Sequence, residues 1–77
     1  MSVSAFVFVE CEHGKSMETA DELKKIGGVE QAYQVTGNYD IIAFVRASNV
    51  RVLGDVVVKK IQKSPGIVKT VTNIVID

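Results

Sequence analysis

The stretch that decides the fold is Val35-Thr36-Gly37-Asn38-Tyr39-Asp40-Ile41-Ile42-Ala43-Phe44-Val45. Residues 29–36 are rich in β-branched and aromatic side chains, and residues 41–47 are almost wholly apolar. Gly37 and Asn38 tolerate positive φ at low cost, which is a strong local signal for a β-hairpin. Tyr39 and Asp40 then place a hydroxyl and a carboxylate at the mouth of a buried strand, where a charge requires an explanation.

The chain is short, neutral and apolar. It has 77 residues, 47% of them hydrophobic, and 9 Lys and Arg balance 9 Asp and Glu. This length predicts a single domain, residues 1–77, whose marginal core needs further stabilisation such as oligomerisation. Zero net charge provides no general attraction for nucleic-acid phosphates or anionic lipid. One cysteine, no signal-peptide pattern and no apolar run of about 18 residues together predict a cytoplasmic protein.

Hydrophobic periodicity divides the chain into six elements. Strands are expected over residues 3–11, 29–36, 40–47 and 67–76, and a first helix over 16–26. A second helix is expected to begin after Ser48-Asn49 and to end before Ser64. The first helix is predicted to bury a stripe of Met17, Ala20 and Leu23, with either Lys24 or Ile26 as its last member. The second is predicted to bury Val50, Leu53, Gly54, Val57 and Ile61, with Gly54 allowing close packing on the sheet.

This order of elements predicts a ferredoxin-like βαββαβ plait, an α+β fold with a four-stranded antiparallel sheet and two helices on one face. Strands 3–11 and 40–47 carry apolar residues on both faces, so we place them in the centre of the sheet. The more polar strand 29–36 belongs at an edge. Because the helices cover only one face, the other keeps large apolar side chains, which predicts a two-fold dimer that packs sheet to sheet.

Two short patterns near the N-terminus are weak candidates for chemistry. Cys11 and His13 lie among glutamates, but no second Cys or His completes a metal set or a catalytic pair. No metal or cofactor is therefore expected, and Cys11 is interpreted as a small buried hydrophobe. The run 14–16 resembles the end of a phosphate-binding loop, but Val9 stands where the earlier glycine belongs.

The aromatic residues of the central strands, Phe6, Phe8 and Phe44, have two interpretations. Aromatic rings at such positions stack on RNA bases in domains of this topology. However, the chain is neutral and lacks the ribonucleoprotein consensus, so packing in the core or in a dimer is favoured and nucleic-acid binding is not expected.

The corner formed by residues 37–40 also has two interpretations that the spacing leaves open. In the first, the corner is only a turn, and Asp40 accepts local backbone hydrogen bonds. In the second, it is a polar site for a small zwitterion. The ligand ammonium would pair with Asp40, and its carboxylate would accept hydrogen bonds from backbone N–H groups and hydroxyls.

The motifs at 36–42 and at 65–75 resemble those of the Lrp/AsnC transcriptional regulators, in particular the glycine–x–tyrosine–aspartate hairpin of their C-terminal domain. That domain is called RAM, for regulation of amino-acid metabolism, and the resemblance covers essentially the whole chain. It implies an amino-acid-sensing module that dimerises through its sheet and assembles into octamers or similar rings, with effector bound between dimers. The ligand-binding residues it implies are Gly37, Asn38, Tyr39, Asp40, Thr70 and Thr72.

Only Met1-Ser2 precede the first strand, so the chain is similar to the stand-alone RAM members, and no DNA-binding domain is expected. The leading hypothesis is a non-enzymatic amino-acid-binding and oligomerisation module. One alternative is a small dimeric α/β-barrel enzyme, an isomerase or cofactor-independent oxygenase, for which only Glu10 and His13 offer titratable groups. Another is a structural partner that co-assembles with full-length regulators.

Overall fold

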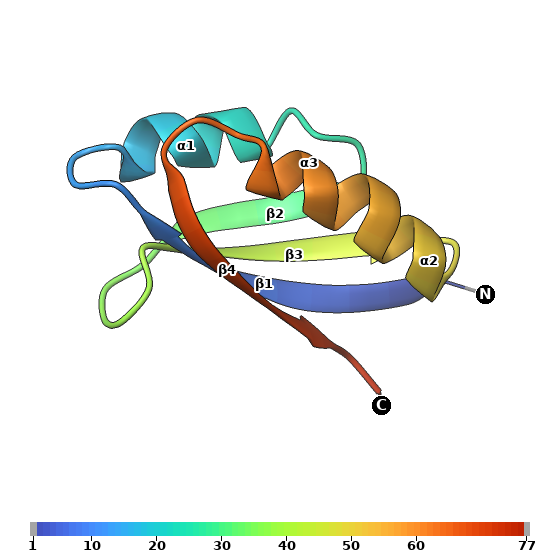
Figure 1. Ribbon diagram of the computed structural model, residues 1–77. Helices are drawn as coiled ribbons and strands as arrows, with labels where there is room; N and C mark the ends of the chain where they lie inside the picture. Colours follow the sequence, from blue (N-terminus) through green and yellow to red (C-terminus); the bar gives the residue numbers. More distant parts are fainter. Residues whose placement is uncertain (1, 77) are drawn as a thin grey trace.

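The computed structural model describes residues 2–76, apart from the side chain of Val56, and places all predicted elements in one layered domain (Figure 1). The first half comprises β1 (Val3–Cys11), α1 (Ser16–Leu23), β2 (Val29–Gln34) and β3 (Ile41–Ala47). The second half comprises α2 (Val50–Val52), η1 (Leu53–Val58), α3 (Lys59–Gln62) and β4 (Ile67–Ile74). The last three helical segments follow one another without a break and form one rod (Figure 1).

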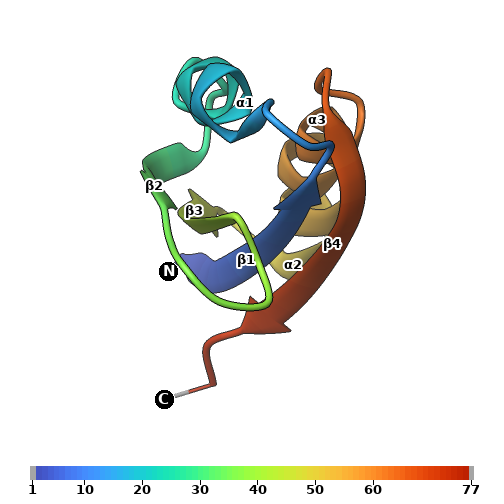
Figure 2. The same cartoon turned by 90° about the vertical axis from the view of Figure 1, so that its left-hand side faces the viewer.

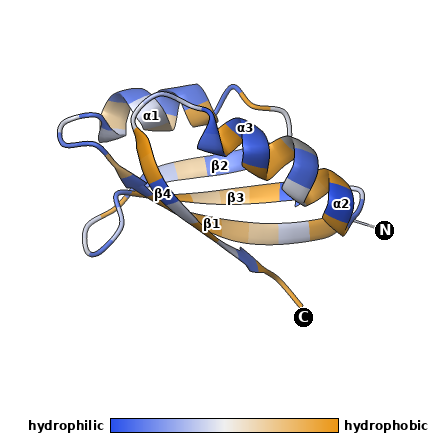
Figure 3. Ribbon diagram, in the orientation of Figure 1, coloured by the Kyte–Doolittle hydropathy of each residue, from blue (hydrophilic) through white to orange (hydrophobic). Residues whose placement is uncertain are grey.

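The four strands form an antiparallel sheet in the order β2-β3-β1-β4. Helix α1 and the rod formed by α2, η1 and α3 both lie on one face of this sheet (Figures 1 and 2). The predicted ferredoxin-like plait is therefore confirmed, with the first and third strands in the centre. In Figure 3, β3 is coloured mostly hydrophobic, whereas β2 at the edge is mixed. The difference follows from position in the sheet, because a central strand has a neighbouring strand on each side, whereas an edge strand is open to solvent on one.

The core lies between the sheet and the helices. Alternate residues of the central strands are fully buried there: Ala5, Val7, Val9, Ile41, Ala43 and Val45. From the helices they meet Leu23, Leu53 and Ile61, which are also buried. The period-two burial pattern sends the intervening residues of β1 and β3 to the opposite face of the sheet.

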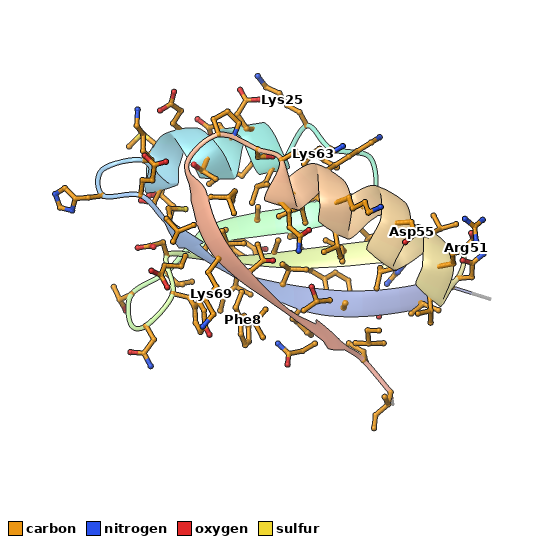
Figure 4. All side chains as sticks on the ribbon, in the orientation of Figure 1. Phe8, Lys25, Arg51, Asp55, Lys63 and Lys69 are labelled. Atoms are coloured by element: carbon orange, nitrogen blue, oxygen red, sulfur yellow. The ribbon has the colours of Figure 1, made fainter. Side chains whose placement is uncertain are left out.

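That opposite face, which we call the open face, carries apolar side chains that no helix covers. Its central members are Phe6, Phe8, Ile42, Phe44 and Val71, placed side by side by the strand register, and Tyr33 of β2 adjoins them. Phe6 remains 44% exposed and Tyr33 56% exposed. Figure 4 shows Phe8 on one side of the sheet and Lys25 and Lys63 on the other side, with the helices. The prediction of an uncovered apolar sheet face is confirmed for this chain.

The first helix differs from the prediction in its length and in the side it buries. It ends at Leu23, because Lys25 and Ile26 donate tighter hydrogen bonds to residues three earlier. Met17, predicted to be buried, is 67% exposed, and Thr19 is buried in its place. The Thr19 hydroxyl donates to the Pro65 carbonyl (2.9 Å), so this polar side chain is satisfied where it is buried.

The second helix is capped as predicted but wound differently. The Asn49 side chain accepts a hydrogen bond from the Val52 N–H (2.8 Å), the geometry of a helix N-cap. The π-helical segment η1 inserts a wider turn, so the neighbours Val57 and Val58 are both buried. The prediction of burial is wrong for two residues of the apolar stripe. Val50 is 56% exposed, and Gly54 lies at the surface, where an added Cβ would touch nothing.

The hairpin connection is longer than the predicted two-residue turn. Strand β2 ends at Gln34, and β3 begins at Ile41. Of the two residues expected to tolerate positive φ, only Gly37 adopts it, with φ of 110°. The Val35 N–H donates to the Asp40 carbonyl (2.9 Å), which closes residues 36–39 into a loop. Thr36 and Asp40, which were predicted as strand ends, therefore lie outside the regular strands. The last strand is also shorter than predicted, since β4 ends at Ile74 and not at Ile76.

Candidate functional site

Asp40 is held in place by three hydrogen bonds at the point where the loop enters β3. Its N–H donates to the Val9 carbonyl (2.9 Å), and its carbonyl accepts from the Val35 N–H (2.9 Å). Its carboxylate oxygen Oδ2 accepts from the Cys11 N–H at 2.7 Å. That distance is typical of a charge-assisted hydrogen bond. The side chain is thereby fixed across the sheet and not merely within its own turn.

The Cys11 N–H is available to Asp40 because the regular pairing of β1 with β3 ends at Val9 and Ile41, before Cys11 is reached. Along its opposite edge β1 pairs with β4, and the register there shifts between Glu10 and Cys11. On the other side, the Cys11 N–H points the same way as the Val9 carbonyl, toward β3, because residues two apart in a strand share an edge. The loop leaves the ladder at this point, so the carboxylate replaces a missing backbone acceptor.

Tyr39 lies on the open face and packs against Phe8. The two ring centroids are 5.5 Å apart, and the planes are tilted by 35°, a favourable geometry for an aromatic pair. Consecutive residues of the loop therefore contact β1 from two directions. The Tyr39 ring contacts it through the open face, and the Asp40 carboxylate contacts its backbone.

The tip of the loop is open to solvent. Thr36, Gly37 and Asn38 are all exposed, and a Cβ added at Gly37 would touch nothing. Glycine is required at this position by its φ of 110° and not by close packing. The site that the sequence predicted at residues 37–40 is therefore half fixed, at Tyr39 and Asp40, and half exposed, at Gly37 and Asn38.

Thr70 and Thr72 lie apart from this loop within the chain. Both lie on β4, where they pair with Val9 and Val7 of β1, and β1 separates β4 from β3. Two strand spacings amount to about 10 Å. The Thr70 hydroxyl accepts a hydrogen bond from Gln62 Nε2 (3.2 Å) on the helix side of the sheet. The structure of the single chain thus brings together four of the six predicted ligand-binding residues.

Cys11 is half-buried against the core, and its surroundings disfavour a thiolate. Burial raises the pKa of the Cys11 thiol above its ordinary value of 9.0, and the nearby Asp40 carboxylate acts in the same direction, while a hydrogen bond with Thr19 opposes them. Within residues 2–76 no three His, Cys, Asp or Glu side chains gather as a metal site would require. No helix of that part of the chain is long and apolar enough to cross a membrane.

Sequence reasoning missed the backbone N–H of Cys11 as the partner of Asp40. No residue pattern could have identified it, because every residue except proline carries such a group. Sequence reasoning also missed the aromatic contact between Phe8 and Tyr39, which joins residues 31 positions apart. Alternation along β1 placed Phe8 on the open face, but only the path of the loop brings Tyr39 to it.

The fold and the site define a class of small α+β domain with an uncovered sheet face and a polar loop at its end. The chain belongs to the Lrp/AsnC family, since the model of the Lrp/AsnC ligand binding domain matches residues 4–77. Among curated relatives, an uncharacterised HTH-type transcriptional regulator of Pyrococcus furiosus, PF0250, is 32% identical over 75 residues. That match covers 94% of this chain and 50% of the relative, so the chain spans about half the length of the regulators it resembles.

Solved structures agree with this assignment. The hypothetical protein PHS023 from Pyrococcus horikoshii is 35% identical and superposes with a TM-score of 0.88, covering 97% of this chain and 90% of that one. The transcriptional regulator NMB0573 from Neisseria meningitidis, solved as a complex with L-methionine, has a TM-score of 0.83 over 97% of this chain and 50% of its own. At 17% identity, this second likeness shows the fold alone.

Proposed function

We propose that this domain is an amino-acid-binding regulatory and oligomerisation module, working in the cytoplasm, in which the loop of residues 36–40 holds the effector. The observation that carries the proposal is the fixed carboxylate of Asp40 beside an exposed glycine-containing loop. Family membership supports a regulatory role, and the methionine complex of NMB0573 supports an amino acid as the ligand.

The chemistry of the site suits a zwitterion. Oδ2 of Asp40 already accepts the Cys11 N–H, whereas Oδ1 has no hydrogen-bond partner among residues 2–76 and is available for an ammonium group. The backbone N–H groups and the exposed side chains at 36–38 offer donors for the ligand carboxylate. Thr70 and Thr72 lie too far from this loop to join it within one chain, so we propose that they contribute from a neighbouring copy.

A second copy of the chain is the proposed occupant of the open face. The face is apolar at its centre, and its rim carries both signs of charge. Arg46 pairs with Glu30 (3.6 Å) and lies over the Phe44 ring (5.6 Å), and Glu10 stands opposite Lys69. The rim therefore offers both positive and negative side chains with which a second copy can pair. Octamers or similar rings, and co-assembly with full-length regulators, are extensions of the same proposal.

We propose that the domain is not an enzyme. The alternative, a small barrel-like isomerase or oxygenase, needs a titratable group between helices and sheet, and the buried side chains described there are aliphatic apart from Thr19, with Cys11 at their margin. Glu10 and His13, the candidates, lie outside it: Glu10 is on the open face, and His13 is exposed in a loop. The regulators among its relatives favour the same choice.

The test is a thermal-shift screen of the twenty amino acids with the wild-type chain, followed by calorimetric titration of any that stabilise it. A ligand that binds only the native state raises the free energy of unfolding by about 2.7 kcal/mol at a hundred times its Kd. At least one amino acid is expected to raise Tm by several degrees. Absence of a shift for all twenty at millimolar concentration, with the chain assembled, contradicts the proposal.

A further inference from the structure

Three successive contacts join β1 to the second half of the loop. The Phe8 ring packs on the Tyr39 ring, the Val9 carbonyl accepts the Asp40 N–H, and the Cys11 N–H donates to the Asp40 carboxylate. The last two fix the backbone and the carboxylate of Asp40. Of these three contacts, the one between the Phe8 and Tyr39 rings uses a side chain of β1, whereas the other two use its backbone. A substitution at Phe8 can therefore remove this contact without altering the proposed ligand-binding residues.

Phe8 also belongs to the open face. It is half-buried and lies between Ile42 of β3 and Val71 of β4 in the strand register. One side of its ring supports Tyr39, while its neighbours in the sheet limit the positions that the ring can adopt. A ring held in this way restricts the Tyr39 ring packed against it, because a packed neighbour leaves a side chain few alternative rotamers.

We infer that Phe8 is a positioning residue for the ligand site: by supporting the Tyr39 ring from the open face, it holds Asp40 in the orientation in which Oδ1 meets the ligand ammonium. This inference rests on the proposed function for the identity of the ligand. It goes further in assigning a role in binding to a residue that contacts neither the loop tip nor the carboxylate. Loss of the ring leaves Tyr39 mobile, and the ligand must then order the loop as it binds.

Phe6 offers a matched control on the same strand. It lies on the same face two residues earlier and forms an aromatic pair of its own with Phe44, with ring centroids 5.0 Å apart. It is more exposed than Phe8, and its aromatic partner is Phe44 of β3 and not Tyr39 of the loop. Any effect of losing an open-face ring on folding or dimerisation is shared by both positions, whereas an effect on the loop belongs to Phe8.

The experiment compares wild type, Phe8→Leu, Phe8→Tyr and Phe6→Leu by calorimetric titration with the amino acid that gives the largest thermal shift. Phe8→Leu is expected to weaken binding by roughly three- to tenfold, the range that the energy of an aromatic pair corresponds to. Phe8→Tyr, which keeps the ring, and Phe6→Leu are expected to bind within about twofold of wild type. Equal affinities for Phe8→Leu and Phe6→Leu overturn the inference.

Amide hydrogen exchange gives a second readout that does not need a ligand. In Phe8→Leu the Cys11 and Asp40 amides are expected to exchange faster relative to the Ala5 and Val45 amides of the central strands, and in Phe6→Leu they are not. If no amino acid binds the wild type, the proposed function fails, and this comparison alone decides the positioning role. If Phe8→Leu does not fold, Phe8→Met replaces it, since Met keeps apolar bulk without a ring.

Discussion

Replacing Asp40 separates the structural role of its carboxylate from its role in binding. In Asp40→Ala the Cys11 N–H loses an acceptor at 2.7 Å. Hydrogen bonds to charged groups contribute about 1.5–3 kcal/mol, and because this site is only partly buried, water replaces part of the loss. We expect the free energy of unfolding to fall by about 1–2 kcal/mol, or roughly 5–15 °C in Tm for a domain of this size.

Asp40→Asn is the control, because its side-chain oxygen can still accept the Cys11 N–H as a neutral hydrogen bond. We expect it to lose less than about 1 kcal/mol of stability. It nevertheless removes the charge that pairs with a ligand ammonium, and truncating one member of such a pair costs about 2–5 kcal/mol of binding. Both variants should therefore bind the effector more than tenfold more weakly, since each 1.4 kcal/mol or so is a factor of ten.

The assay is thermal unfolding followed by calorimetric titration, with all proteins at the same concentration because assembly itself raises Tm. If Asp40→Asn binds the amino acid as tightly as wild type, the carboxylate belongs only to the fold and the proposed site is wrong. If Asp40→Ala is as stable as wild type, the hydrogen bond to Cys11 contributes nothing, and the carboxylate does not replace a missing ladder acceptor.

Five further variants and conditions test other parts of the structure. Gly66→Ala should lower stability by about 1–3 kcal/mol in chemical unfolding, because Gly66 has φ of 84° and a Cβ there would lie 2.6 Å from Thr19 Oγ1. Gly54→Ala, where a Cβ meets nothing, should raise stability by about 0.5–1 kcal/mol, and a loss there would contradict the helical assignment. The wild-type chain should sediment as a dimer or larger at micromolar concentration, whereas Phe44→Lys on the open face should sediment as a monomer. A filter-binding assay of the 77-residue chain with random duplex should detect no binding at physiological ionic strength, given its zero net charge, and salt-sensitive micromolar binding would count against this. The pKa of the Cys11 thiol is raised in the folded chain, so the folded state disfavours the thiolate more than the unfolded state does. The resulting contribution to stability is fully present below the unfolded pKa near 9 and is lost as pH rises through the folded pKa. Cys11→Ala should therefore flatten the decline in stability above pH 9 in unfolding measured against pH.

The sequence alone determined the topology and the exposed face. The β1 range was predicted at both ends, and the central placement of β1 and β3 followed from apolar residues on both of their faces. Both features can be predicted from sequence, because hydrophobic periodicity identifies the strands and the preferred right-handed connection then limits how they are ordered in the sheet. The motif around residues 37–40 likewise identified the loop without any knowledge of its contacts.

Only the tertiary structure decided how that loop is held and which side of each helix is buried. Thr19 replaced Met17 in the core because Pro65, 46 positions away, accepts its hydroxyl. Asp40 met the Cys11 N–H because the regular pairing of β1 with β3 ends at Val9 and Ile41, where the loop leaves the ladder. Both outcomes depend on a backbone group supplied by a distant segment. Since a backbone N–H or carbonyl looks the same at every residue, its use is decided by where the chain passes and not by which side chain it carries.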